Sequence, residues 1–291
     1  MKNDLHIRTN FSASADKSWG WERVLQKCQD LGLERISITD FDTCLFHVIN
    51  KLYDTTTIYN GQIITGMECD VCENGITFEL LVYNFEPIKT FNWSYQTYGT
   101  LEDRQSKIKN LLLSCAQKYH IAIDTSVKFN GKVDFAHKYL YENMLSFPQN
   151  KDFFDKYDIK SLTDFYNLST KQRDFPLYVS METIFPSVKM VTDFIHSVGG
   201  FVVVGQPCKS KNKDNLDSIL NYALKYGVDG IEVYHPAHSK EDIEYLRNFS
   251  KQHKMIITGG SNFNGKPESC EFGIKNIDDM ETEILQGVTL N

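Results

Sequence analysis

Apolar residues recur at helical spacing near the start of the chain and then give way to short apolar runs. Residues 21–31 carry an apolar stripe and a polar opposite face, which predicts an amphipathic helix that ends at Gly32. Apolar or alternating runs over residues 35–39, 63–68 and 76–83 predict strands. The first part of the chain is therefore expected to alternate between strands and helices.

The same alternation occupies the last third of the chain. Apolar stripes over residues 188–198 and 216–223 predict helices, and apolar runs at 201–204, 230–234 and 255–258 predict strands. The first of these runs is continuously apolar, as in a parallel strand that is covered on both faces. Strands that alternate with helices predict an α/β fold built on a parallel sheet or barrel.

The middle of the chain has a different character. From about residue 91, aromatic and polar residues mix without strand alternation, and residues 108–119 carry a helical stripe. We therefore predict three segments. Residues 1–90 form the first part of a barrel, residues 91–180 a mostly helical insertion, and residues 181–291 the second part of the barrel.

Polar clusters follow most of the predicted strands. They lie at residues 6–8, 40–42, 68, 206, 235–238 and 261–264. Side chains two apart on a strand leave the same face, so His6 and Arg8 are expected to point together. Binding sites in barrels and open α/β sheets are built at the carboxyl ends of strands. We therefore expect these clusters to share one pocket.

The composition limits the kinds of partner that this protein is expected to bind. The 291 residues carry a formal net charge of -7, which argues against a surface that coats nucleic acid. No apolar run reaches the roughly 18 residues that a membrane helix needs, so we expect no membrane partner. Seven scattered cysteines suggest reduced thiols and a cytoplasmic protein. The oligomeric state does not follow from the sequence.

The order of the polar motifs resembles the PHP (polymerase and histidinol phosphatase) superfamily. The motifs are Asp4-Leu5-His6-Ile7-Arg8-Thr9, Thr39-Asp40-Phe41-Asp42, Gly66-Met67-Glu68, Gly205-Gln206-Pro207 and Gly260-Ser261-Asn262-Phe263-Asn264-Gly265. In particular, the chain resembles the stand-alone phosphoesterases that act on nucleoside bisphosphates and short oligonucleotides. The resemblance implies a distorted (β/α)7 barrel and, in the family, a cluster of two or three divalent metals.

Most of the family's metal ligands are replaced in this chain. Five positions where the family has His or Asp carry residues that bind divalent metals poorly or not at all: Arg8, Phe41, Gln206, Asn262 and Asn264. Ala13 stands where the family has another acid, and Glu79 lies in a strand that has lost its His. Of the expected ligands, His6 and Glu68 remain. A guanidinium has no lone pair to donate, so we expect no metal cluster and no cofactor.

The substitutions fit a second hypothesis about charge. Without metals, buried acids lack a balancing positive charge, and Arg8 brings one to the position beside Glu68. We therefore predict that Arg8 pairs with Glu68, in part through two hydrogen bonds, in place of a metal.

The sequence favours a PHP-like protein with a degenerate metal site that is inactive as a metal-dependent phosphoesterase. Its pocket would hold a small anionic or polar ligand between His6, Arg8, Asp40, Phe41, Glu68, Gln206, His235, Asn262 and Asn264. The alternative is an active phosphoesterase that hydrolyses nucleotide or oligonucleotide phosphates with one weakly held divalent metal.

In that alternative, His6 and Glu68 bind the metal with help from Asp40, Asp42 or Glu79, and His235 or His238 acts as general acid. A third class, a hydrolase of another kind, finds no support, because the sequence contains no Gly-x-Ser-x-Gly, P-loop or His-Glu-x-x-His motif.

Overall fold

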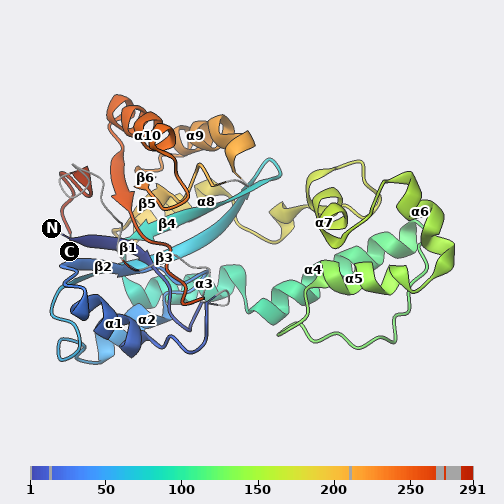
Figure 1. The fold of residues 1–291 in the computed structure, drawn as a ribbon, viewed down its shortest axis with the longest axis horizontal. Helices are drawn as coiled ribbons and strands as arrows, with labels where there is room; N and C mark the ends of the chain where they lie inside the picture. Colours follow the sequence, from blue (N-terminus) through green and yellow to red (C-terminus); the bar gives the residue numbers. More distant parts are fainter. Residues whose placement is uncertain (1, 13–14, 210–211, 267–271, 273–282, 291) are drawn as a thin grey trace. The chain divides into compact units, whose positions relative to one another are not determined.

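The computed structural model describes residues 2–12, 15–209, 212–266, 272 and 283–290. Seven strands form one sheet in which spatial order follows chain order. They are β1 (Asn3–Ile7), β2 (Arg35–Ile38), β3 (Gln62–Glu73), β4 (Ile76–Tyr83), β5 (Phe201–Val204), β6 (Gly230–Tyr234) and β7 (Ile256–Gly259). Just beyond β7, Phe263 pairs with Ile7 of β1. The sheet is therefore a nearly closed barrel, as the resemblance predicts (Figure 1).

The sheet is mixed rather than wholly parallel, so the prediction of a parallel barrel needs one correction. β1, β2 and β3 pair in parallel, as do β5, β6 and β7, but β4 is antiparallel to β5. Asn74 and Gly75 connect β3 to β4, and both have positive φ angles of 50° and 82°. Such a two-residue turn reverses the chain, and a reversed strand cannot run parallel to the rest of the sheet.

Helices connect the strands and cover the barrel. The helices of this part are α1 (Trp21–Asp30), α2 (Leu45–Leu52), α3 (Pro87–Tyr98), α8 (Val188–Ser197), α9 (Leu216–Lys225) and α10 (Lys240–His253), with short 3-10 turns η2 (Met181–Thr183) and η3 (Lys213–Asn215) nearby in the chain. α10 begins with a capping box in which the Ser239 hydroxyl and the Asp242 carboxylate each accept the other residue's backbone N–H. α2 was not predicted from the sequence.

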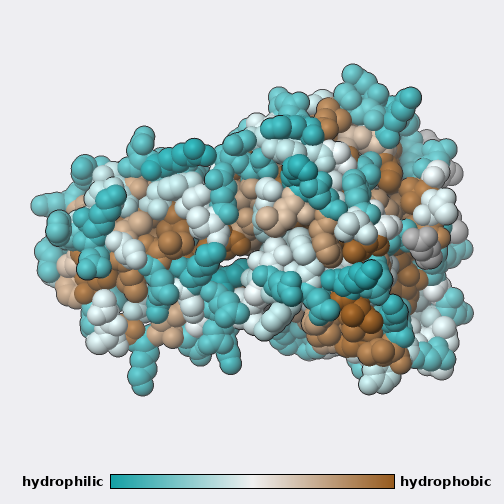
Figure 2. Space-filling model, turned by 180° about the vertical axis from the view of Figure 1, so that it is seen from behind, coloured by the Kyte–Doolittle hydropathy of each residue, from teal (hydrophilic) through white to brown (hydrophobic). Residues whose placement is uncertain are grey.

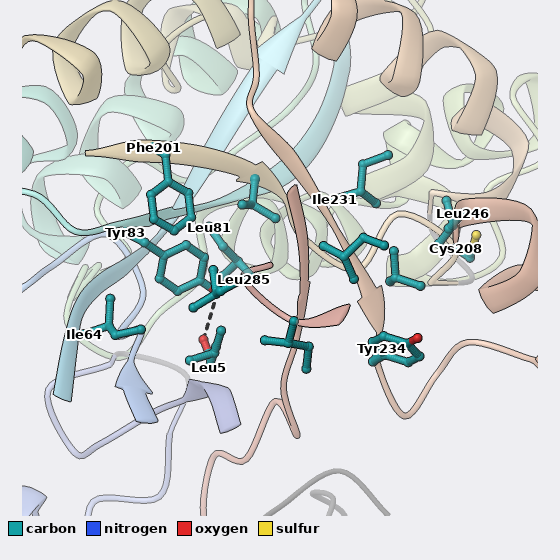
Figure 3. Packing of buried hydrophobic residues seen from close by; sticks show 14 of the residues in the cluster. Leu5, Ile64, Leu81, Tyr83, Phe201, Cys208, Ile231, Tyr234, Leu246 and Leu285 are labelled. Carbon is teal, nitrogen blue, oxygen red and sulfur yellow. Dashed lines mark hydrogen bonds between the residues drawn. The ribbon is translucent and has the colours of Figure 1, made fainter. Parts of the chain in front are cut away.

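One apolar cluster fills the barrel and reaches the outer helices. It includes Leu5, Ile64, Leu81, Tyr83 and Phe201, all buried. Figure 3 shows the Tyr83 ring beside Phe201, with its hydroxyl directed to the Leu5 carbonyl oxygen at 2.8 Å. A buried phenol that finds an acceptor avoids the cost of an unpaired polar group. This hydrogen bond ties β4 to β1, the strand that carries His6 and directly precedes Arg8.

The chain divides into two compact units. The first comprises Met1–Glu73, Thr77–Gln96 and Pro186–Asn291, and the second comprises Asn74–Ile76 and Thr97–Phe185. The helices of the second unit are α4 (Leu101–Lys118), α5 (Ala136–Leu145), η1 (Pro148–Asn150), α6 (Lys151–Lys156) and α7 (Leu162–Lys171). Buried aromatic side chains such as Phe165 and Phe175 form part of its own core.

No helix among the described residues is both long enough and apolar enough to cross a bilayer. The face of the molecule in Figure 2 mixes hydrophilic side chains with smaller hydrophobic patches.

Candidate functional site

Buried polar side chains meet at the carboxyl end of the barrel strands. His6 lies on β1, Arg8 follows that strand, Glu68 lies on β3 and Glu232 on β6. His6, Glu68 and Glu232 have no exposed surface, and Arg8 is 7% exposed. The alternation of β1 sends His6 and Arg8 to the same side, where both contact Glu68. The prediction that these two side chains point together is confirmed.

Arg8 and Glu68 form a buried ion pair. The Arg8 Nε donates to Glu68 Oε2 at 2.8 Å, and the Nη2 also contacts Oε2. The predicted pair is confirmed, although both nitrogens share one oxygen instead of bridging the two. The other oxygen, Oε1, accepts a hydrogen bond from Gln206 Nε2 at 3.0 Å. Burial alone would raise the pKa of Glu68, but Arg8 and His6 outweigh it and hold the pKa well below its usual range.

His6 bridges two carboxylates. Its Nδ1 lies 2.9 Å from Glu232 Oε1, and its Nε2 lies 3.4 Å from Glu68 Oε2. Burial alone would lower the pKa of His6, but the charges of Glu232 and Glu68 raise it to about 9. Because each carboxylate accepts a hydrogen bond, both ring nitrogens carry protons. His6 is therefore an imidazolium at neutral pH.

Glu232 completes the charge balance, and the sequence analysis did not single it out. Its Oε2 accepts the backbone N–H of Gln206 at 2.8 Å. Burial would raise the pKa of Glu232, but the neighbouring His6 lowers it below its ordinary value. A lone acid within the apolar run Gly230–Tyr234 was the available signal, because a buried carboxylate on a strand needs a cationic partner. Glu68 and Glu232 are balanced by Arg8 and His6.

Gln206 and Asn262 extend the network with neutral amides. Asn262 Nδ2 donates to Gln206 Oε1 at 3.2 Å, while Gln206 donates to both carboxylates. Both residues have positive φ angles, 40° for Gln206 and 54° for Asn262. This backbone region is uncommon for residues other than glycine, and Gln is less suited to it than Asn. This strained backbone conformation directs the Gln206 N–H toward Glu232 and its side-chain amide toward Glu68.

The motif after β2 lies beside this network. Asp40 accepts hydrogen bonds from the backbone N–H and the hydroxyl of Thr9, at 2.6 and 2.7 Å. Burial raises the pKa of Asp40 to about 6 despite those bonds. The Arg8 guanidinium lies 5.7 Å from the centre of the Phe41 ring, and Asp42 Oδ1 accepts the backbone N–H of Asp70. Asp40 and Asp42 therefore hold backbone in place, and Phe41 flanks the cation.

His235 and His238 occupy the loop after β6. The His235 ring centre lies 6.1 Å from that of His6, and its Nδ1 accepts the backbone N–H of Ala237. Burial lowers the pKa of His235 to about 3, so the ring is neutral. His238 Nδ1 lies 2.9 Å from the Val233 carbonyl oxygen, which it can bond only as a donor. His238 thus fixes the loop, and the His235 ring lies between it and His6 in the chain of ring contacts.

Two predicted positions, Asn264 and Ala13, do not join this network within the described residues. Asn264 Oδ1 accepts the backbone N–H of Lys266, and its carbonyl oxygen accepts that of Asp16. Its side chain closes a turn of its own loop and makes no hydrogen bond to the His6–Glu68 network within the described chain. Ala13 lies outside the described residues.

The donor set can be tested against a divalent metal. One atom from each of His6, Glu232 and His235 lies within 4.8 Å of the others. Metal ligation needs an unprotonated nitrogen, but both ring nitrogens of His6 face carboxylates. In His235, Nδ1 accepts an N–H, so the proton of the neutral ring is on Nε2. With these tautomers neither histidine presents a free lone pair, but His235 Nε2 is buried and has no hydrogen-bond partner among the described residues, so a change of tautomer would make it available to a metal.

Comparison with known proteins bears on the fold. No family model matches the chain. A phosphoribosyl 1,2-cyclic phosphate 1,2-diphosphodiesterase from Eggerthella lenta is 23% identical over 271 residues, which are 91% of this chain and 95% of that protein. The structure of a protein inferred to be a metal-dependent phosphoesterase, from Bifidobacterium adolescentis, superposes with a TM-score of 0.61 and 22% identity over 99% of this chain and 97% of that one.

The chain has the PHP-type phosphoesterase fold. The structure of an amidohydrolase from Chromobacterium violaceum with bound sulfate shares the architecture, with a TM-score of 0.60 and 15% identity over 93% of this chain and 90% of that one. In the PHP fold of this chain, β1, β3 and β6 bring together His6, Glu68 and Glu232.

Proposed function

We propose that this chain is a PHP-fold protein in which a buried ion-pair network replaces the metals, and that it lacks metal-dependent phosphoesterase activity. The observation that carries the proposal is the Arg8 guanidinium on Oε2 of Glu68. A fixed positive charge at that carboxylate repels a divalent cation and occupies the oxygen that would bind it. The activity of the metal-dependent relatives needs that cation to activate water and to neutralise phosphate.

The hydrogen bonding of the network supports the same proposal. Both oxygens of Glu68 and both oxygens of Glu232 accept hydrogen bonds from Arg8, Gln206 or His6. A buried polar network is stable when each member is satisfied, and a metal would have to displace several of these bonds. Within these four groups, the two cations balance the two carboxylates.

We further propose that the partly buried residues beside this network, Phe41 and Asn262, bind a small polar or anionic ligand together with it. Phe41 and Asn262 lie next to Arg8 and Gln206, so they form the rim of the site. An amide, an aromatic ring and a nearby guanidinium suit a carboxylate, a phosphate or a hydroxyl group.

Metal content tests the proposal. The purified untagged protein is analysed by elemental mass spectrometry before and after incubation with manganese, iron and zinc. We expect far less than one metal per chain and no release of phosphate from nucleotides or oligonucleotides. A metal retained at one or more per chain, with phosphate release that chelation abolishes, would contradict the proposal. A thermal-shift screen with phosphate, carboxylates and sugars then tests this ligand binding.

The spacing of His6, Glu232 and His235 favours a second candidate, a phosphoesterase with one metal. In that case His235 would exchange its tautomer and His6 would lose a proton. One metal per chain that disappears in His235→Ala would support this candidate. A phosphoribosyl cyclic phosphate is the substrate to assay first, because the Eggerthella lenta relative is named for it.

A further inference from the structure

The second compact unit contains an extended segment beside a helix. α4 ends in a turn where His120 has a φ of 55° and donates its N–H to the Gln117 carbonyl, while Ile121 donates to the Ala116 carbonyl at 2.9 Å. This pair of bonds is the Schellman motif, which reverses the chain at a helix end. Residues 121–125 consequently return beside α4, and together they line an open groove.

Two buried asparagines hold this segment as a neighbouring strand would. Asn150 accepts the N–H of Ala122 at 3.0 Å and donates to its carbonyl at 2.8 Å. Asn143 does the same for Asp124, with both distances at 2.8 Å. Residues two apart present their backbone groups to the same side when the chain is extended. The two amides therefore satisfy one edge of a strand that belongs to no sheet.

Ile121, Ile123 and Thr125, on the opposite edge of the segment, line the groove. Backbone groups alternate along an extended chain, so Ile123 points away from the two asparagines. Within the described chain, neither its N–H nor its C=O has a hydrogen-bond partner, and the same holds for the Ile121 carbonyl and the Thr125 N–H. An edge with free donors and acceptors is a template for another strand.

The groove is wide and almost uncharged. Its volume is about 860 Å³. Apart from the segment itself, its lining comes from Asn110, Leu113, Ser114, Gln117 and His120. The α4 residues among these are three, four and seven apart, so they form one helix face. Leu113 and Ile123 offer apolar contacts, and no acidic or basic side chain other than His120 lines the groove.

We propose that this groove binds an extended peptide segment of a partner protein, which adds a strand to the Ile123 edge. The peptide's backbone would pair with the free groups of residues 121–125, and its uncharged side chains would pack against the α4 face. Recognition of this kind draws affinity from main-chain hydrogen bonds and specificity from alternate side chains. The neutral lining excludes charged side chains from the inserted positions, because the groove offers them no counter-charge. The inference is independent of the barrel site.

The test uses the full chain and a displayed library of random twelve-residue peptides. Selected peptides are synthesised with free and with N-methylated backbones, and their binding is measured by calorimetry. We expect binding that N-methylation at alternate residues weakens by about tenfold or more, the equivalent of one or two lost hydrogen bonds. Protection of the Ile123 amide from hydrogen exchange is expected in the complex.

Variants locate the contact. Ile123→Pro removes the donor at the centre of the edge, and Ser114→Trp fills the groove from α4 without changing the segment. Each should weaken binding by about tenfold or more. Lys118→Trp, on α4 outside the groove lining, is the matched control and should retain affinity. If the Ile123→Pro variant fails to fold, the peptide affinity of Ser114→Trp alone tests the proposal.

Three outcomes would overturn the proposal. The first is a library that yields no peptide sensitive to Ser114→Trp. The second is binding that survives N-methylation. The third is a dimer, detected by sedimentation, that Ser114→Trp dissociates, because the occupant would then be a second copy of this chain.

Discussion

The Arg8 Nε lies 2.8 Å from Oε2 of Glu68, although the two residues are 60 positions apart and both are buried. β1 delivers the cation and β3 delivers the anion, and the barrel holds the strands that carry them. Neither charge has water to replace its partner, so the pair is an obligatory part of the folded state.

Arg8→Met should destabilise the protein strongly. The substitution keeps an apolar stem of similar length but leaves Glu68 as a buried carboxylate with one counter-charge fewer. Removing one partner of a buried ion pair typically costs about 3–5 kcal/mol of the free energy of unfolding. Urea denaturation at pH 7 measures this loss in the free energy of unfolding.

The matched control is the exposed pair Lys51–Glu86, where Nζ lies 2.7 Å from Oε1 and half of the lysine side chain is exposed. Lys51→Met should change the free energy of unfolding by less than about 1 kcal/mol. Equal effects of the two substitutions would show that the barrel pair is not a buried one in solution.

Stability should fall as pH rises from 6.5 to 8.5. The folded pKa of His6 is raised to about 9 from an ordinary value of 6.5. Its contribution is therefore complete below pH 6.5, where both states are protonated, and is lost as pH rises through 9. At 1.36 kcal/mol per pH unit, the loss between pH 6.5 and 8.5 is about 2–3 kcal/mol.

Urea titrations at pH 6.5, 7.5 and 8.5 measure this loss. His6→Gln should flatten the profile, because its side chain does not titrate. His253→Gln, an exposed position on α10, should leave the slope as it is. A wild-type profile that is already flat would contradict a charged His6.

Restoring the family's residues should restore metal binding. The five changes are Arg8→His, Phe41→His, Gln206→His, Asn262→Asp and Asn264→His. They remove the fixed positive charge and return ligands with lone pairs, so we expect at least one manganese or zinc per chain by elemental mass spectrometry. Because Asn264 turns within its own loop, a variant that omits Asn264→His should bind nearly as well.

The control is the same set of changes without Arg8→His. We expect it to bind little metal, because the guanidinium would still occupy Glu68. Metal binding that is equal with and without Arg8→His would show that the ion pair does not block the site.

Gly260→Ala should disturb the site through its backbone. A Cβ at Gly260 would overlap the backbone N and Cβ of His6 and would lie 2.8 Å from its Cα. Neither strand can retreat without breaking barrel pairing, so we expect a loss of about 1–3 kcal/mol in the free energy of unfolding.

Gly20→Ala is the control, because its Cβ would meet Glu22 Oε2 at 3.3 Å and nothing nearer. Its effect should stay below about 1 kcal/mol. The measurement is the urea midpoint of each variant. Equal midpoints for the two would refute the close approach of Gly260 to His6.

The sequence predicted the regular parts of the barrel well where apolar periodicity was strong. The run 201–204 and the run 230–234 coincide with β5 and β6. Periodicity failed for α2, which is short and follows a polar turn, and for the direction of β4. The direction of β4 could have been predicted from the Asn74-Gly75 pair, because two such residues between strands form a hairpin turn that reverses the chain.

The site was predicted where a motif and a strand end coincided. Arg8 and Glu68 were paired because the resemblance places both at the family's metal-ligand positions and their charges are opposite, and the structure confirms that pair. Glu232 was overlooked because it lies within a strand instead of after it. Asn264 was predicted to lie in the site because residues next to it in the sequence do. A turn of one or two residues can, however, point a side chain in another direction, and Asn264 bonds within its own loop.

The chain of contacts from Arg8 through Glu68 and His6 to Glu232 alternates in sign. The charges of these four groups sum to nearly zero, so their electrostatic potentials cancel within a few ångströms. These four groups therefore add little field of their own at the barrel mouth. The association rate of a charged ligand would then depend on ionic strength through the other charges of the chain, whose formal net charge is -7, and hardly through these four groups.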